Sequence, residues 1–291
     1  MTDSNIVPPK FVFIVPYRKR EEHKHLFKTY MKHVLEDIPE ETYEIYFSHQ
    51  ADDREFNRGA VKNIGFLAIK DKYPNHYKTI TFVFNDVDTM PYSKNIIRYD
   101  TKPGVIKHFY GYKTTLGGIV SIQGYDFEKL NGFPNYWGWG FEDNALNQRA
   151  LKNSSITINR DTFFNIGDLK IVQSFEAVTR RISATNKKHF LEDDGNDGLS
   201  SISYLSFSLD ETDKEERMIN INTFNVTERH DPSKIKEVHM RNIIGQHKRF
   251  APTPHFSLRR NRANIEQHKN ATNTGIQRQT STIGRQNFRM F

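Results

Sequence analysis

The sequence predicts an α/β fold built on a parallel sheet with helices on both faces, and three observations support this prediction. Apolar runs with the length of buried strands occur at 11–15, 43–48 and 79–84. Segments with helical spacing of apolar residues lie between them, at 21–36 and 56–70. The strands and helices alternate, which is typical of β-α-β units, and the ligands of such sheets collect at the carboxyl ends of the strands.

The rest of the chain has weaker patterns, and its elements are predicted from short apolar runs and turn residues. We expect further strands at 105–110, 119–122, 156–158, within 193–207, and at 218–224, and further helices at 125–130, 144–151, 175–191 and 233–244.

Composition limits the classes of protein that the chain can belong to. Its 291 residues are 36% hydrophobic and 13% aromatic, enough for a sizeable core in one large domain or two small ones. There is no cysteine, which excludes disulfides, thiolate metal sites and cysteine nucleophiles. No apolar run approaches the ~20 residues of a membrane span, and the first residues lack the apolar core of a signal peptide. We therefore expect a soluble protein with a cytoplasmic location.

The net charge of +7 is concentrated near the C-terminus. From Glu228 onward there are 13 Lys and Arg against 4 Asp and Glu, so residues 1–227 have a net charge of −2. We expect residues 1–226 to form the main domain and 227–291 to be a basic extension that is partly disordered, because it has few large apolar residues. A nucleic-acid-binding protein is one alternative, although the extension lacks the interleaved aromatic residues of a dedicated single-strand binder.

The segment 131–149, NGFPNYWGWGFEDNALNQR, contains both tryptophans of the chain and an acidic pair. Its glycines and proline predict a loop that delivers Glu142 and Asp143 to the first turn of a helix. Such an acidic pair often only complements the helix dipole. Trp137 and Trp139 favour a second interpretation, because flat aromatic surfaces beside a carboxylate suit a sugar that stacks one face and loses a hydroxyl proton.

Charged residues follow two of the predicted strands directly. Arg18 and Arg20 come after the first strand, and Asp86 and Asp88 come after the third. An Asp-x-Asp pair can hold a divalent cation, and that cation together with arginines can bind a diphosphate. Each motif alone also fits a solvated turn. Their combination at two ends of one sheet predicts a site for an anionic ligand.

Six segments occur along the chain in this order: FVFIVPYRKR, EFNRGAVKNIGF, FVFNDVDTMP, YKTTLGG, LNGFPNYWGWGFED and NDGLSSISY. Together they resemble the β-1,4-galactosyltransferase family, with the nearest likeness to its xylosylprotein branch. The resemblance covers about 11–224 and implies a catalytic domain with a GT-A-like nucleotide-diphospho-sugar transferase fold, whose sheet is mixed but mostly parallel. It also implies inverting, manganese-dependent transfer of a hexose from a UDP-sugar to a hydroxyl of a glycan or glycoprotein. Galactose is the expected sugar and GalNAc the alternative, with magnesium as an alternative metal.

The same resemblance implies roles for individual residues. Asp143 is the expected catalytic base and Asp88 the expected metal ligand, with His189 as a candidate for a second ligand. The expected donor-binding residues are Pro16, Tyr17, Arg18, Arg20, Phe56, Arg58, Asp86, Val87, Thr115 and Trp139. The expected acceptor-binding residues are Tyr136, Trp137, Gly140, Glu142 and Asn144.

The chain departs from the family pattern at three places. Asn144 stands where the family has an acidic residue on the acceptor side. Thr115 stands where many members have a tyrosine, which leaves space beside the donor sugar for an N-acetyl group. The metal-binding histidine expected after 169–172 is absent there. A catalytically impaired sugar-binding or nucleotide-sugar-binding module of the same fold is therefore the alternative function.

Overall fold

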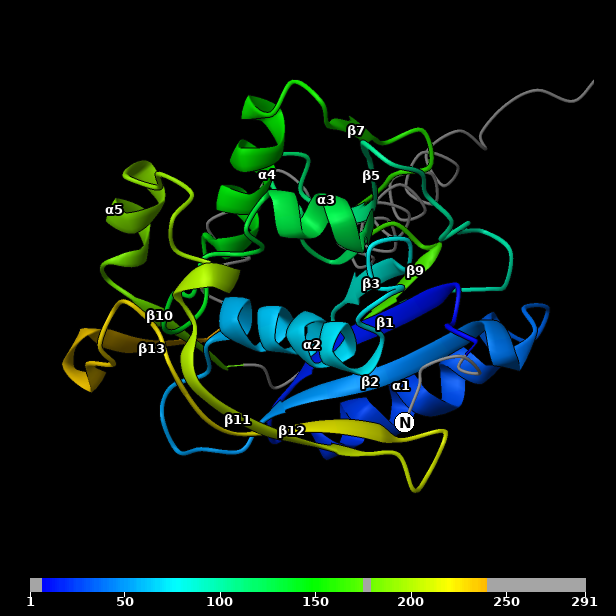
Figure 1. Cartoon of the computed structure of the whole chain (residues 1–291), viewed down its shortest axis with the longest axis horizontal. Helices are drawn as coiled ribbons and strands as arrows, with labels where there is room; N and C mark the ends of the chain where they lie inside the picture. Colours follow the sequence, from blue (N-terminus) through cyan, green and yellow to red (C-terminus); the bar gives the residue numbers. More distant parts are fainter. Residues whose placement is uncertain (1–6, 175–178, 240–291) are drawn as a thin grey trace, which may run out of the picture. The chain divides into compact units, whose positions relative to one another are not determined.

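A nine-stranded sheet forms the centre of the computed structural model, which describes residues 7–174 and 179–239 (Figure 1). The strand order is β11, β12, β2, β1, β3, β6, β5 and β7, with β8 also paired to β5. Strands β12, β2, β1 and β3 run parallel to one another, whereas β6 is antiparallel to both β3 and β5. The sheet is therefore mixed but mostly parallel, as predicted. Its strands are β1 (Phe11–Tyr17), β2 (Tyr43–Gln50), β3 (Thr81–Asn85), β5 (Val105–Gly111), β6 (Ile119–Gln123), β7 (Thr157–Asn159), β8 (Phe164–Asn165), β11 (Ser203–Asp210) and β12 (Arg217–Asn225).

Helices cover both faces of this sheet, which confirms the predicted layers. The helices are α1 (Glu21–Val34), α2 (Arg58–Lys72), α3 (Gly124–Lys129), α4 (Glu142–Lys152) and α5 (Asn186–Leu191). Two short two-stranded sheets, β4 (Thr89–Pro91) with β9 (Ile171–Gln173) and β10 (Thr179–Ser183) with β13 (Ile235–His239), complete the described part.

Strand β1 divides the core in two, because successive side chains of a strand point to opposite faces. Phe11, Phe13 and Val15 pack in the cluster that contains the buried face of α1. Val12 and Ile14 pack in the other cluster, against α2. All five side chains are almost fully buried. The continuous apolar run of β1 is thus explained by burial on both faces.

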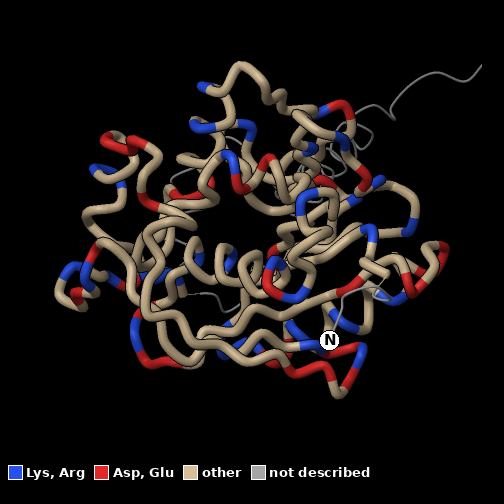
Figure 2. Tube along the Cα trace, in the orientation of Figure 1, with Lys and Arg blue, Asp and Glu red and all other residues tan. Residues whose placement is uncertain are grey.

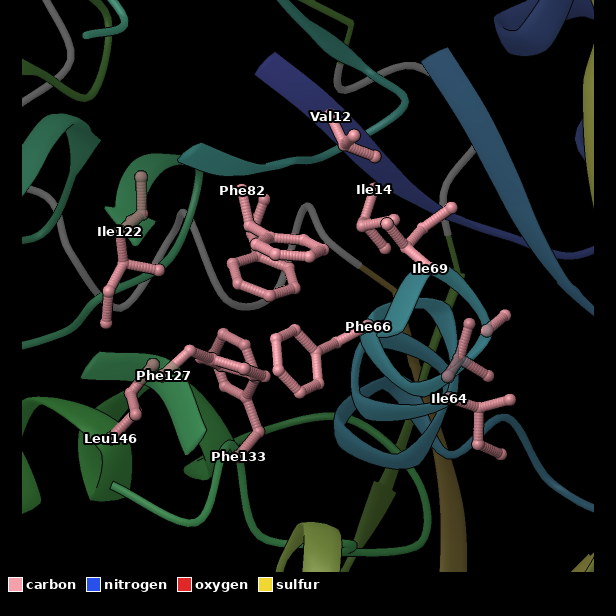
Figure 3. Packing of buried hydrophobic residues seen from close by; sticks show 14 of the residues in the cluster. Val12, Ile14, Ile64, Phe66, Ile69, Phe82, Ile122, Phe127, Phe133 and Leu146 are labelled. Carbon is pink, nitrogen blue, oxygen red and sulfur yellow. The ribbon is translucent and has the colours of Figure 1, made fainter. Parts of the chain in front are cut away.

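A group of phenylalanines packs between helix α2, strand β3 and helix α3 (Figure 3). Phe66 of α2 lies 4.8 Å from Phe82 of β3 and 5.0 Å from Phe127 of α3, measured between ring centroids. Phe133, from the loop before α4, packs 5.6 Å from Phe127 in the same group. This packing attaches the 131–141 loop to α2, so that the loop and the helix share one core.

Two of the predicted helices are wrong where the structure describes them. The helix expected over 175–191 is replaced by strand β10 up to Ser183 and by α5 from Asn186, while 175–178 lie outside the described residues. The helix expected over 233–244 is replaced by a 3-10 turn at Pro232–Lys234 and by β13, and 240–244 are not described. The reason is tertiary pairing: β10 and β13 satisfy each other's backbone groups, which overrides local preference.

The expected extension begins inside the described region. Residues 227–239 include β13, and the carbonyl of Glu228 accepts a hydrogen bond of 2.7 Å from the indole of Trp137. Residues 240–291 lie outside the described residues, so the division at 226 stays a prediction. Across 7–174 and 179–239, no helix has the length and apolar character that a membrane span requires.

We predict that Asn63→Ala lowers the free energy of unfolding by about 2–4 kcal/mol, because the buried backbone N–H and carbonyl of Phe133 both lose their hydrogen-bond partner. Asn63 Nδ2 donates to the carbonyl of Phe133 at 2.7 Å, and Asn63 Oδ1 accepts from the N–H of Phe133 at 2.9 Å. Asp71→Ala, on the exposed end of the same helix, should change stability by less than about 0.5 kcal/mol. Urea denaturation of both variants checks this, and equal effects would contradict it.

Candidate active site

A cleft of about 470 Å³ opens where β1, β2 and β3 end. Its position follows from the topology, since the carboxyl ends of parallel strands meet at one edge of a sheet. Nine residues predicted from the sequence line it: Pro16, Arg18, Arg20, Phe56, Arg58, Asp86, Val87, Asp88 and Trp139.

The cleft has an excess of positive charge. Eight further residues line it that the sequence analysis did not identify: Lys19, Asp53, Arg54, Glu55, Gly138, Thr179, Arg180 and Arg181. Together the lining holds seven Lys and Arg against four Asp and Glu. Such a balance favours an anionic ligand with several oxygens, because arginines bind phosphate oxygens with two parallel hydrogen bonds. Arg180 and Arg181 were missed because they were assigned to a helix instead of to β10.

Asp88 is buried in this lining and is neutralised by two arginines. Its Oδ2 lies 3.0 Å from Nη1 of Arg20 and 3.9 Å from Nη2 of Arg180. Burial lowers the pKa of Arg180, and the charge of Asp88 only partly offsets this effect. Arg180 also lies 5.4 Å from the ring centroid of Trp139. The carboxylate expected to bind metal is thus held by guanidinium groups from two separate segments.

The described residues give a metal ion few ligands besides Asp88. Across 7–174 and 179–239, no three His, Cys, Asp or Glu side chains are grouped so as to hold a metal. A hard carboxylate oxygen in an anion-binding cleft still fits manganese or magnesium, provided that the ligand's own oxygens complete the shell. Asp88 therefore fits one position of a metal site that depends on the bound anion.

Trp139 and Trp137 have different environments, although they are only two residues apart. Trp139 is half-buried and lines the cleft, and its backbone N–H donates to the carbonyl of Arg181 at 2.6 Å. Trp137 is only 3% exposed and stacks on Phe224 with a centroid distance of 5.7 Å. The prediction that Trp137 stacks against an acceptor sugar is therefore corrected: its ring belongs to the core. Gly138 lies between them at φ +75°, where a side chain would clash with the carbonyl of Arg181.

Arg58 joins the cleft to the acidic pair at the start of α4. Its Nη2 pairs with Asp86, while its Nη1 pairs with Glu142 and lies 2.6 Å from Oδ2 of Asp143. Burial lowers the pKa of Arg58, but the charges of Asp143, Asp86 and Glu142 raise it well above its usual value. One guanidinium therefore connects the strand-end carboxylate of β3 with both carboxylates of the predicted acceptor side.

Asp143 has a second cationic partner that the sequence analysis did not identify. Nζ of Lys62 lies 2.9 Å from Oδ1 of Asp143. Burial raises the pKa of Asp143, but Arg58 and Lys62 together outweigh that effect and hold the pKa below its usual value. Gly117 leaves room for the carboxylate, because a Cβ there would lie 2.2 Å from Oδ2. A lysine four residues after Arg58 on one helix was the available signal, since such residues share a face.

The remaining acceptor-side residues lie outside the cleft lining, with Glu142 and Asn144 in the first turn of α4 and Gly140 and Tyr136 in the loop before it. The backbone N–H of Gly140 donates to Oε2 of Glu142 at 3.1 Å, and Glu142 is almost fully buried. Asn144 is half-buried and donates to the carbonyl of Thr114 at 3.2 Å. Tyr136 is buried, which raises its pKa.

Three predicted site residues have other contacts. Tyr17 is buried on the α1 side and donates to Glu21, and burial raises its pKa to about 12. Thr115 lies outside the cleft lining and donates to the carbonyl of Tyr112 at 3.0 Å. His189 lies with its Nδ1 3.3 Å from Oε2 of Glu228 and is not in the lining, so its role as a metal ligand stays a prediction.

Two family descriptions match the chain along most of this fold. The "N-terminal region of glycosyl transferase group 7" matches residues 5–99, and the "N-terminal domain of galactosyltransferase" matches residues 105–174. Mouse β-1,4-galactosyltransferase 1 is 36% identical over 165 residues, which are 53% of this chain and 40% of that protein. The xylosylprotein 4-β-galactosyltransferase of Caenorhabditis elegans is 30% identical over 189 residues, 62% of this chain and 63% of that protein. The chain belongs to the β-1,4-galactosyltransferase family.

Solved structures of this family share the fold. The catalytic domain of Drosophila β-1,4-galactosyltransferase 7, solved with xylobiose, superposes with a TM-score of 0.61 at 24% identity, covering 73% of this chain and 93% of that one. A mutant of the same fly protein, solved with manganese, UDP-Gal and xylobiose, gives a TM-score of 0.58 at 22% identity with the same coverage. The predicted GT-A-like fold is therefore confirmed. The matched region spans less than two thirds of the curated galactosyltransferases above.

We predict that Asp143→Asn destabilises the protein at pH 7 by about 3 kcal/mol, because the buried Lys62 loses its charged partner. The lowered pKa of Asp143 means that its stabilisation is present above the unfolded value near 3.9 and is lost as the pH falls through the folded value. The difference from the unmodified chain should therefore shrink in acid.

Urea denaturation at pH 7 and near pH 3 measures this difference. Asp71→Asn, at an exposed carboxylate of α2, is the matched control and should show almost no effect at either pH. A loss at pH 7 that stayed the same size in acid would mean that the charge of Asp143 is not its cause.

Proposed function

We propose that the chain is an inverting glycosyltransferase that moves a hexose, galactose in the first place, from a UDP-sugar to a hydroxyl of a glycan or glycoprotein. One observation carries the proposal. Arg58 lines the cationic cleft and also holds Asp143 and Glu142, so an anion site and a carboxylate base share one side chain. The family relationship supports it, as does the complex of the fly protein with UDP-Gal and xylobiose.

The donor would lie in the cleft with its diphosphate among the arginines. Arg18, Arg20 and Arg180 present cationic groups there, and Trp139 offers a half-buried indole face. Guanidinium groups stabilise the negative charge that develops on the departing diphosphate, and this contribution is largest where water is excluded. Manganese or magnesium, when bound at Asp88, would supply Lewis-acid stabilisation of the same phosphate oxygens.

Asp143 would act as the general base from the other side of the reacting carbon. Its carboxylate takes the proton of the acceptor hydroxyl as that oxygen forms the new bond to the anomeric carbon. The bond from this carbon to the phosphate oxygen breaks in the same displacement, and UDP leaves with the electron pair. A single displacement inverts the anomeric configuration and needs no covalent enzyme intermediate. Gly117 leaves room for the Asp143 carboxylate in this position, since a Cβ at residue 117 would lie 2.2 Å from Oδ2.

A binding module without turnover is the second candidate, and the ion pairs of Asp88 are the observation that favours it. With Arg20 and Arg180 on its carboxylate, Asp88 could serve anion binding alone. Lys, Arg, Asp and Glu are interspersed along the described chain (Figure 2), and residues 1–227 have a net charge of −2, which does not favour nucleic acid as the ligand. The expected cytoplasmic location stays a prediction, and GalNAc stays the alternative donor.

We predict that Asp143→Asn retains UDP-sugar binding and loses transfer by about 10²-fold or more, because a general base contributes about 10²–10⁴ in rate. UDP release is measured with a panel of acceptor sugars, and binding by calorimetry. Asp71→Asn is the control for expression and handling. Near-normal transfer by Asp143→Asn would remove Asp143 from the role of base, and no UDP release from the unmodified chain with any donor or acceptor would favour the binding module.

We predict that manganese binds weakly to the free protein and clearly in the presence of UDP, because Asp88 alone leaves most of the metal shell to the phosphates. Calorimetric titration with and without UDP measures this. Asp88→Ala should abolish the UDP-dependent part, whereas His189→Ala should leave it unchanged, since His189 pairs with Glu228. Equal metal affinity in both titrations would contradict the prediction.

A further inference from the structure

Lys62 is a buried lysine whose side chain points into the candidate site from helix α2. It is only 1% exposed, and its Nζ lies 4.3 Å from the ring centroid of Phe133 and 2.9 Å from Oδ1 of Asp143. Lysine is almost never fully buried without a partner, because removing an ammonium group from water is costly. A buried lysine at this position therefore needs a reason beyond packing.

Each oxygen of the Asp143 carboxylate has its own cationic partner, and the two partners differ in whether they line the cleft. Oδ2 is held by Arg58, which is shared with Asp86 and Glu142 and which also lines the cleft. Oδ1 is held by Lys62, whose ion pair in the described chain is with Asp143 and which does not line the cleft. A ligand in the cleft can therefore reach Arg58 but not Lys62.

We propose that Lys62 is a positioning residue for the transfer reaction, which keeps Asp143 ionised and fixed in place while Arg58 binds the donor diphosphate. This inference rests on the proposed function. It concerns the ionisation and position of Asp143, and Lys62 itself contacts neither substrate.

The physical reason is the competition for Arg58. A diphosphate in the cleft would compete for the guanidinium with its own oxygens, so Arg58 would interact less strongly with Asp143 once the donor is bound. Asp143 would then stand beside Glu142 in a poorly solvated place, and two adjacent carboxylates raise each other's pKa. A protonated Asp143 cannot take a proton from the acceptor, so a second cation outside the cleft is needed to prevent this.

Among the residues that the structure describes, Lys62 is the cation that pairs with Asp143 from outside the cleft lining. Burial lowers the pKa of His108 to about 4, so this neighbour is neutral near pH 7. Nε of Arg160 donates a hydrogen bond of 3.0 Å to Nδ1 of His108. The titratable or charged groups that face Asp143 are Arg58 and Lys62 of α2, Glu142 of α4, Asp86 after β3 and His108 of β5.

The first test follows the titration of Asp143 directly and does not depend on turnover. Carboxyl carbons of labelled aspartates are followed by NMR against pH, with the Asp143 signal assigned by its absence in Asp143→Asn. In the unmodified chain its midpoint should lie below the ordinary value of about 3.9. Lys62→Met should raise the midpoint by about 1–3 units, because one adjacent positive charge is removed. UDP should enlarge this difference, since it competes for Arg58.

Matched variants separate charge from packing. Lys62→Gln can still donate a hydrogen bond but carries no charge, so its midpoint should rise as in Lys62→Met. Lys70→Met, two turns later on the same helix, removes a lysine that pairs with Glu128 and should leave Asp143 unchanged. An unchanged midpoint in Lys62→Met and Lys62→Gln would overturn the proposal. If neither variant folds, a midpoint near 3.9 or above in the unmodified chain overturns it equally.

The second test is the pH profile of kcat for UDP-sugar transfer. The acid limb, which reports the base in the substrate complex, should move to higher pH in Lys62→Met by about the shift seen in the titration. A purely structural lysine would change the amount of folded protein but leave the limb in place, and that outcome would overturn the proposal. Absence of transfer in the unmodified chain is a failure of the proposed function instead, and the NMR titration distinguishes the two failures.

Discussion

One guanidinium group, that of Arg58, is the constraint on which the candidate site depends. It is nearly buried and meets three carboxylates from two elements, so it cannot move without leaving negative charge uncompensated. A buried charge that loses its partner costs several kcal/mol, about 3–5 in measured cases. The positions of α2, the end of β3 and the start of α4 are therefore fixed relative to one another by electrostatics as well as by the phenylalanine core.

The packing around this group explains how segments far apart in the chain stay in register. Phe66 and Phe133 join α2 to the loop before α4, and Asn63 fixes the backbone of that loop with two hydrogen bonds. The loop can then turn sharply at Gly138 and deliver Trp139 to the cleft while Trp137 enters the core. A rigid apolar layer beneath a charged layer holds the candidate base within a narrow range of positions.

Much of the fold and part of the site could be predicted from the sequence. The strands β1 and β3 were predictable because both their faces are buried, which produces continuous apolar runs, and β2 was predictable from its shorter apolar pattern; residues that follow these strands form the cleft. Strands β10 and β13 were not predictable, because their basic residues carry no strand pattern and only mutual pairing makes them extended. Arg180 and Lys62 were missed for related reasons: one sits on a misassigned strand, and the other looks like an ordinary surface lysine until its burial is known.

The ion pairs of the site show that several cations of the cleft are already paired with carboxylates before any ligand binds. Arg20 and Arg180 are paired to Asp88, and Arg58 is paired to Asp86 and to Asp143. A ligand must exchange its own oxygens for these carboxylates, so a singly charged anion gains little, whereas a diphosphate can replace several contacts at once. In the proposed reaction the same exchange links binding to chemistry, because the arginine that the donor would engage also holds the candidate base. Under this proposal, specificity for a polyanion and readiness of Asp143 are two consequences of one shared set of charges.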